Sequence, residues 1–123
     1  MSQQTITADT AAEAYLTILA DRGVDYLFGN AGTDFASIIE ALSKAQLGEA
    51  RAPTPVTVPH ENVAVAMAHG YYLMTDRPQA VMLHVSVGTA NGICGVLNAS
   101  RDRVPLLFSA GRTPINEDGP LGS

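Results

Sequence analysis

Three times in this chain, a short apolar run leads through a polar or glycine-containing turn into a longer segment with helical character. The runs that we expect to form β-strands lie at residues 26–28, 55–58, 80–85 and 106–110. The run at 80–85 does not alternate apolar with polar residues, which is typical of a buried parallel strand. A further helix precedes the first strand. This alternation predicts an α/β fold with a mostly parallel sheet and helices on both of its faces.

Four helices are expected around these strands. The first begins at a capping-box sequence, Thr10 to Glu13, and ends at Gly23, because the left-handed residue after a last helical turn favours glycine. The others are expected at about residues 35–45, 61–75 and 90–100.

The spacing of apolar residues and the composition of the tail indicate how the chain ends. In the helix at 90–100, Ile93, Val96 and Leu97 are expected to face the core. The tail at 111–123 holds two prolines and three glycines, and we expect no helix or strand there.

Length, charge and cysteine content narrow the class of protein. The chain has 123 residues, of which 46% are hydrophobic and 15% charged, so it can build the core of one domain. Its net charge of −5 argues against nucleic acid and anionic membranes as partners. No run is long enough to span a bilayer, and the single cysteine, Cys94, has no partner for an internal disulfide. We therefore expect a cytoplasmic protein that binds neither nucleic acid nor a membrane.

The turns that follow the strands indicate where a site would lie. Those at residues 29–34, 59–61 and 86–89 all connect a strand to a helix, so in a parallel sheet they meet at one edge. Each contains a glycine or a polar side chain that can contact a ligand. We expect a binding site at this edge, shared with a partner.

The helix that begins near Glu61 has almost no polar face. A helix that is apolar all round is buried on more than one side, here by its own sheet and by a partner. This pattern predicts that the chain is not a monomer. The apolar positions are Val63, Ala64, Val65, Ala66, Met67, Ala68, Tyr71, Tyr72 and Met74.

Four segments, in order over nearly the whole chain, carry a family resemblance. They are Val24-Asp25-Tyr26-Leu27-Phe28-Gly29-Asn30-Ala31-Gly32, His60-Glu61 with Ala64, Ala68, Gly70 and Tyr71 behind it, Gly88-Thr89-Ala90-Asn91, and Arg103-Val104-Pro105-Leu106-Leu107. Together they resemble the N-terminal pyrimidine-binding domain of thiamine-diphosphate-dependent enzymes. The groups that the chain resembles most are acetolactate synthase large subunits and benzoylformate-decarboxylase-like enzymes. The resemblance implies the thiamine-diphosphate-binding fold in a truncated form.

The resemblance implies a catalytic and cofactor-binding role for Glu61, which would hydrogen-bond the pyrimidine ring nitrogen of thiamine diphosphate. In an apolar contact this carboxyl group is expected to be easier to keep protonated. From the residue pattern alone, Glu61 is better explained as a first-turn acid that the helix dipole stabilises by about 0.3–1 kcal/mol, and it is the resemblance that favours the cofactor role. Gly32, Gly88 and Asn91 are implied cofactor-binding residues, although Asn91 also fits an N-terminal polar contact in its own helix.

His84, expected to end the third strand, falls where benzoylformate-decarboxylase-like sequences carry a histidine that faces the substrate. A catalytic role in proton transfer is implied, and the alternative is a hydrogen-bonded core histidine. Thr33 is implied as a substrate contact, or else as a hydroxyl that caps the next helix. His60 is expected to orient the strand–helix junction, and His69 is expected to be structural.

The resemblance covers only the front part of such enzymes. Residues 1–123 are expected to be a partial pyrimidine-binding domain, with the central domain and the diphosphate-binding domain absent. The absent domain would hold Mg²⁺, and no metal ligand is expected in this chain. The implied function is the N-terminal part of a 2-keto acid decarboxylase or carboligase, a lyase or transferase whose isolated front portion is inactive.

Several alternatives remain open. The chain could be a separate subunit of a two-chain decarboxylase, paired with a chain that carries the diphosphate-binding domain. It could be a non-catalytic interaction domain. The chain could also be a flavodoxin-like mononucleotide binder. Against this alternative, we find no phosphate-binding loop richer in glycine than Gly29-Asn30-Ala31-Gly32, which is a weak signal. The expected partners are further copies of the chain, in a dimer or larger assembly, or that second chain, with a 2-keto acid as substrate.

Overall fold

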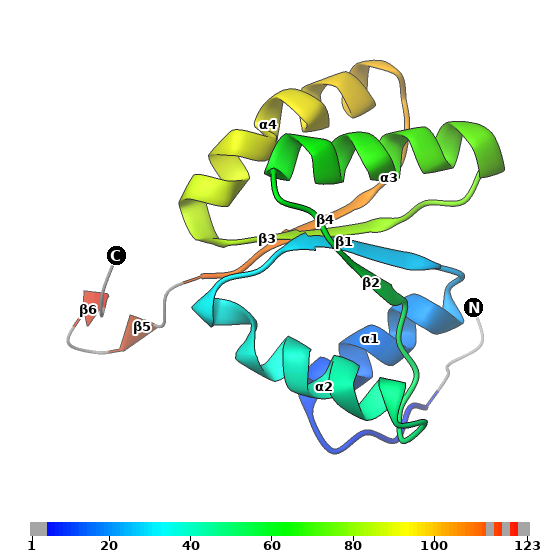
Figure 1. Ribbon diagram of the computed structural model, residues 1–123, viewed down its shortest axis with the longest axis vertical. Helices are drawn as coiled ribbons and strands as arrows, with labels where there is room; N and C mark the ends of the chain where they lie inside the picture. The colour runs from blue at the N-terminus through cyan, green and yellow to red at the C-terminus, as the bar shows by residue number, and fades with distance from the viewer. Residues whose placement is uncertain (1–4, 113–114, 117–118, 121–123) are drawn as a thin grey trace.

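A computed structural model describes residues 5–112, 115–116 and 119–120 of the chain. Helices and strands alternate through it (Figure 1). In chain order they are α1 (Ala11–Asp21), β1 (Tyr26–Asn30), the 3₁₀ turn η1 (Thr33–Phe35), α2 (Ala36–Gln46), β2 (Thr54–Thr57), α3 (Glu61–Thr75), β3 (Ala80–Leu83), α4 (Val85–Arg101), β4 (Leu107–Ala110), β5 (Ile115–Asn116) and β6 (Gly119–Pro120).

The first four strands form one parallel sheet in the order β2-β1-β3-β4. Phe28 of β1 pairs with Val56 of β2 on one side and with Val81 of β3 on the other. Helices α3 and α4 cover one face of this sheet, and α1 and α2 cover the other (Figure 1). The predicted α/β fold with helices on both faces is therefore confirmed.

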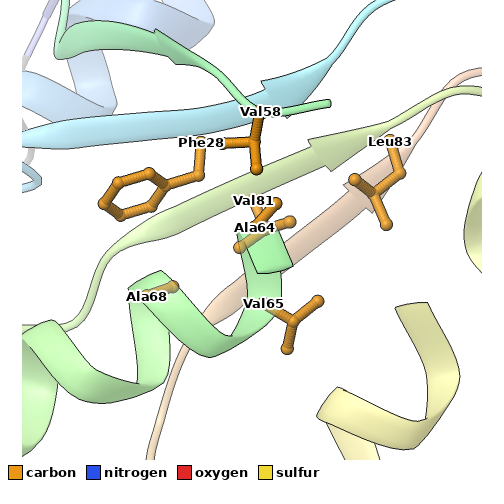
Figure 2. Close-up of a cluster of buried hydrophobic side chains, with 7 residues drawn as sticks. All are labelled: Phe28, Val58, Ala64, Val65, Ala68, Val81 and Leu83. Carbon is orange, nitrogen blue, oxygen red and sulfur yellow. The ribbon is translucent and has the colours of Figure 1, made fainter. Parts of the chain in front are cut away.

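Each face of the sheet has its own hydrophobic core, because successive strand residues point to opposite sides. Leu27 and Ala80 pack with residues of α1 and α2, whereas Phe28, Val81 and Leu83 pack under α3. Figure 2 shows this second core, in which Ala64, Val65 and Ala68 of α3 and Val58 from the turn after β2 meet the strands.

The predicted first helix begins and ends where the sequence indicates. Thr10 is the N-cap of α1, and its hydroxyl oxygen accepts a hydrogen bond from the Glu13 backbone N–H at 3.2 Å. The Glu13 carboxylate accepts from the Asp9 N–H at 3.1 Å, one residue before the position expected in a standard capping box. After the last turn, Gly23 takes φ = +82°, the left-handed conformation that glycine adopts without strain.

The expected start of the fourth helix is wrong. Strand β3 ends at Leu83 and α4 begins at Val85, so the segment expected to be a loop forms the first turns of the helix. Val85 takes φ = +36°, which is unusual for a β-branched residue and turns the chain sharply from strand to helix. Periodicity in the sequence gave no sign of this turn.

The expected inward face of α4 is wrong for two of its three residues. Ile93 and Leu97 are 46% and 55% exposed, whereas Val96 is partly buried and packs against the core as expected. The buried side of α4 is a row of small residues, and it lies against α3 because the missing side chains allow the two helices to approach closely. This row consists of Gly88, Gly92, Gly95 and Ala99.

Helix α3 is buried by the sheet and by α4, and one apolar face is left over. Val63, Met67 and Met74 are 48%, 40% and 85% exposed. Tyr71, another of the apolar positions of this helix, is half-buried, and its hydroxyl donates to Asp25 Oδ2 at 2.8 Å. The apolar face that remains for a partner is therefore present without Tyr71.

The tail differs in part from expectation. Strands β5 and β6, two residues each, pair antiparallel where we expected no element. Residues 113–114, 117–118 and 121–123 of that tail, like residues 1–4, lie outside the described residues. Among the helices of the described part of the chain, none is both long and apolar enough to cross a membrane.

Candidate functional site

Glu61 is the first residue of α3, at the edge of the sheet where the parallel strands end. His60 precedes it as the N-cap, and its Nδ1 accepts a hydrogen bond from the Asn62 N–H at 3.2 Å. His60 thus orients the junction, as expected. A carboxylate in the first turn also lies at the positive end of the helix dipole.

Two amide side chains hold the Glu61 carboxylate, one on each oxygen. Asn30, the last residue of β1, donates from Nδ2 to Oε1 at 3.1 Å. Asn91 of α4 donates from Nδ2 to Oε2 at 3.2 Å. Because α4 begins at Val85, Asn91 lies in its second turn and contacts α3, so the expected N-terminal contact within its own helix is wrong.

The hydrogen-bond donors around Glu61 favour the ionised form of its carboxyl group. Its pKa is lowered, first by its own backbone N–H, against the opposing effect of burial, and then by Asn91 and Asn30. The physical reason is that its neighbours in the chain are hydrogen-bond donors, which favour the charged form. The expectation that this carboxyl group is easily kept protonated concerns an apolar contact and stays a prediction.

Gly88 lies beside the same carboxylate. A Cβ placed on Gly88 would lie 3.4 Å from Glu61 Oε1 and 3.5 Å from Leu83 Cβ, so the glycine packs directly beside the carboxylate. Gly88 lies in the first turns of α4 and not in a loop. Three of the predicted cofactor-binding residues, Glu61, Gly88 and Asn91, therefore lie together.

The predicted histidine, His84, lies in a second cluster at the same edge of the sheet. It is the N-cap residue of α4, immediately after β3, and its side chain is 40% exposed. His84 Nδ1 lies 2.5 Å from Oδ1 of Asp34 in η1, whose side chain is only 8% exposed. Asp34 was not predicted from the sequence, because a turn acid after a glycine is common in loops without function.

The other predicted residues are placed as follows. Gly32 lies against the His84 ring, and no contact brings it to Glu61. Thr33 is exposed, and neither η1 nor α2 has a side-chain N-cap hydrogen bond, so the capping alternative for Thr33 is wrong. His69 Nε2 lies 3.2 Å from Asp102 Oδ2, at the far end of α3, which fits the expected structural role.

Asn30 is the second site residue that the sequence analysis missed. The sequence placed it only within longer segments, one of the family resemblance and one a weak phosphate loop, yet β1 continues through it and its amide donates to Glu61. Its position directly after Phe28 and Gly29 at a strand end was the available signal. Within the described residues, no three His, Cys, Asp or Glu side chains come together as they would around a metal ion.

Comparison with known proteins places the chain in a protein family. Residues 9–122 match a family model described as thiamine pyrophosphate enzyme, N-terminal TPP binding domain. The chain is 34% identical over 107 residues to the acetolactate synthase large subunit of Haemophilus influenzae, covering 87% of this chain and 18% of that relative. It is 31% identical over 106 residues to the benzoylformate decarboxylase of Pseudomonas aeruginosa, covering 84% and 18%.

Solved structures agree with the sequence relatives. The thiamine diphosphate-dependent 4-hydroxybenzoylformate decarboxylase of Rhodococcus jostii RHA1 superposes with a TM-score of 0.69 and 26% identity. That superposition covers 83% of this chain and 18% of the decarboxylase. The chain thus spans about a fifth of the length of the proteins it matches.

Proposed function

Because the chain belongs to the thiamine pyrophosphate enzyme family, as an N-terminal TPP-binding domain, we propose that it serves a decarboxylase or carboligase that acts on a 2-keto acid. The observation that carries this proposal is the Glu61 carboxylate, which two amides hold at the edge of a parallel sheet. The two named sequence relatives, one acetolactate synthase and one decarboxylase, support the reaction class.

The residues around Glu61 fit the aminopyrimidine end of thiamine diphosphate. A carboxylate within reach of a ring nitrogen can share a proton with it, and Gly88 places no side chain beside Oε1. Asn91 and Asn30 hold the carboxylate, and Gly32 lies against the His84 ring, after β1 at the same edge of the sheet. We propose Glu61, Gly32, Gly88 and Asn91 as the cofactor-binding residues of this chain.

Each residue has a separate task in this proposal. The bound cofactor supplies the nucleophilic carbon and the electron sink. Glu61 holds a proton at the pyrimidine ring nitrogen, and His84 gives or takes a proton at the substrate. The exposed hydroxyl of Thr33 is available to hydrogen-bond the substrate carboxylate.

The diphosphate end requires a metal ion, and the described residues hold no group of three His, Cys, Asp or Glu side chains around which one would bind. We propose that a diphosphate-binding domain holds Mg²⁺, either on a further part of the protein or on another chain. In the second case the protein is a subunit of a two-chain decarboxylase. The cytoplasmic location stays a prediction.

The test is the substitution Glu61→Gln in the protein at its native length, loaded with thiamine diphosphate and Mg²⁺. Glutamine keeps the size of the side chain but cannot share a proton in the same way, so proton exchange at the thiazolium carbon should slow by about 100-fold. Exchange is followed by NMR, and circular dichroism checks that the fold is unchanged.

Glu49→Gln is the matched control, because Glu49 is exposed in the turn after α2. It should leave the exchange rate unchanged. Exchange in Glu61→Gln at the unmodified rate would refute the assigned role. Absence of cofactor-dependent exchange in the unmodified protein, with any partner, would favour the non-catalytic interaction domain.

A further inference from the structure

Asp34 and His84 form a pair that the sequence analysis did not contain. The two residues are fifty positions apart and meet because η1 and the end of β3 lie at the same edge of the sheet. Asp34 Oδ1 lies 2.5 Å from His84 Nδ1, and the carboxyl side chain is 8% exposed against 40% for the imidazole. A buried acid thus meets one nitrogen of a histidine that remains open to solvent.

Two glycines make room for this pair. A Cβ on Gly32 would overlap the His84 ring, and a Cβ on Gly111 would overlap the Asp34 carboxylate. Gly32 has φ = −132°, and the backbone of Gly111 also lies outside the left-handed region, so both positions need the missing side chain and not an unusual backbone. The Gly111 N–H donates to the Leu83 carbonyl at 3.0 Å, which fixes the end of β4 beside β3.

The Asp34 carboxylate has one oxygen on His84 and one without a partner. Oδ2 is buried and has no hydrogen bond within the described chain. Burying an acid in this way is unfavourable unless its remaining contact is strong. An ionised carboxylate can only accept, so the short contact requires His84 Nδ1 to donate.

We propose that Asp34 is a positioning residue that keeps the proton of neutral His84 on Nδ1 and leaves Nε2 as the nitrogen that exchanges protons. This inference adds to the proposed role of His84, and the catalytic use of the fixed tautomer rests on the proposed function. A fixed tautomer matters because only the nitrogen without a proton can act as a base. In the described part of the chain, Nε2 has no protein hydrogen bond that would compete.

The experiment uses the protein at its native length with ¹⁵N-labelled histidine, and His84→Gln assigns the signal. At a pH where His84 is neutral, the ring nitrogen shifts should show the proton on Nδ1. In Asp34→Asn the ratio of the Nδ1–H to the Nε2–H form should fall by about tenfold or more, as expected for loss of a charge-assisted hydrogen bond.

Asp102→Asn is the matched control, since Asp102 is the carboxylate partner of His69 in the chain's other histidine–aspartate pair. It should leave the His84 ratio unchanged. Gly111→Ala is a second, independent variant, because it displaces the Asp34 carboxylate without changing its charge. It should also lower the ratio.

A proton found on Nε2 in the unmodified protein would overturn the inference, and this measurement needs no variant to fold. An unchanged ratio in Asp34→Asn would overturn it as well. Neither result depends on turnover or on Glu61. The inference can therefore fail while Glu61→Gln still supports the proposed function, and the reverse also holds.

Discussion

Asn30, the last residue of β1, donates its amide to Glu61, the first residue of α3, across 3.1 Å. The two residues are thirty-one positions apart in the chain, and the fold brings them together. Asn91 of α4 donates to the other oxygen of the Glu61 carboxylate. A single carboxylate therefore joins a strand end and two helices at the edge of the sheet.

The first prediction concerns the pH dependence that follows from this contact. We expect Asn30→Ala combined with Asn91→Ala to raise the Glu61 pKa towards its ordinary value of 4.5, because two donors to the charged form are lost. A lowered pKa contributes stability that is present above the unfolded-state pKa and is lost as pH falls through the folded-state pKa. The variant should therefore lose stability near neutral pH and little in acid.

Carboxyl ¹³C NMR titration of Glu61 measures this shift directly. Asn98→Ala is the control, because Asn98 is an exposed asparagine on the same helix, α4, and has no side-chain bond to Glu61. A Glu61 pKa that stayed as low in the double variant as in the unmodified protein would contradict the account.

The second prediction concerns the row of small residues between α3 and α4. A Cβ on Gly95 would lie 2.6 Å from Asn62 Oδ1 and 2.9 Å from Val65 Cβ, which is too close without a shift of α3. We expect Gly95→Ala to lower the free energy of unfolding by about 1–3 kcal/mol, the usual cost of overpacking.

Gly70→Ala is the matched control, since Gly70 lies on α3 and a Cβ added there would have nothing within 4 Å. Alanine there should stabilise by up to about 1 kcal/mol through helix propensity. Denaturant unfolding of both variants measures the difference. Equal effects would show that α3 and α4 are not packed as closely as described.

The third prediction concerns Gln79, which is fully buried. Its Oε1 accepts from the Asp25 and Tyr26 N–H groups at 2.9 and 2.7 Å, and its Nε2 donates to the Arg77 and Pro78 carbonyls. Gln79→Leu would leave these backbone groups unpaired, so we expect a loss of about 2–5 kcal/mol in the free energy of unfolding.

Gln46→Leu tests whether the effect belongs to this position, because Gln46 is exposed at the end of α2. It should change the free energy of unfolding by less than about 0.5 kcal/mol. If urea unfolding gave similar losses for the two variants, the buried amide would not hold the turn before β3.

The fourth prediction concerns cofactor affinity. Residues 1–123 alone should bind thiamine diphosphate weakly or not at all, because we propose that Mg²⁺ and the diphosphate are held by another domain, and the described residues hold no group of three His, Cys, Asp or Glu side chains for a metal ion. Calorimetry with Mg²⁺ measures this. Micromolar affinity for these residues by themselves would contradict the proposed division of the site between this domain and a diphosphate-binding domain.

How much could be foreseen depends on whether a feature is local. The parallel sheet, the cap at Thr10 and the placement of Glu61 follow from local pattern, because turn chemistry and periodicity act within a few residues. The start of α4 could not be foreseen, since Val85 adopts a conformation that its residue type disfavours. The contacts of Asn30 and Asp34 could not be foreseen from local pattern, although Asn30 lies at a strand end, because each acquires its role from a partner thirty or more positions away.

The last prediction concerns association through the α3–α4 face, by which we mean the exposed apolar residues of the two helices that cover one side of the sheet (Figure 1). We expect the protein at its native length to form a dimer or larger species through this face. Leaving these residues in water forgoes about 25 cal/mol per Å² of apolar area, and exposed apolar residues gathered on two neighbouring helices are typical of an interface. Its residues are Val63, Met67, Leu73 and Met74 of α3 and Val87, Ile93 and Leu97 of α4.

Met67→Glu with Ile93→Glu should therefore weaken association by at least about tenfold, because charge is introduced on both helices of the face. Light scattering over a range of concentrations measures the change. Ile39→Glu is the control, since Ile39 is 50% exposed on α2, on the opposite side of the sheet. A stable monomer of the unmodified protein at high concentration would count against the interface, and so would equal effects of the two changes, because both would mean that the α3–α4 face meets no partner.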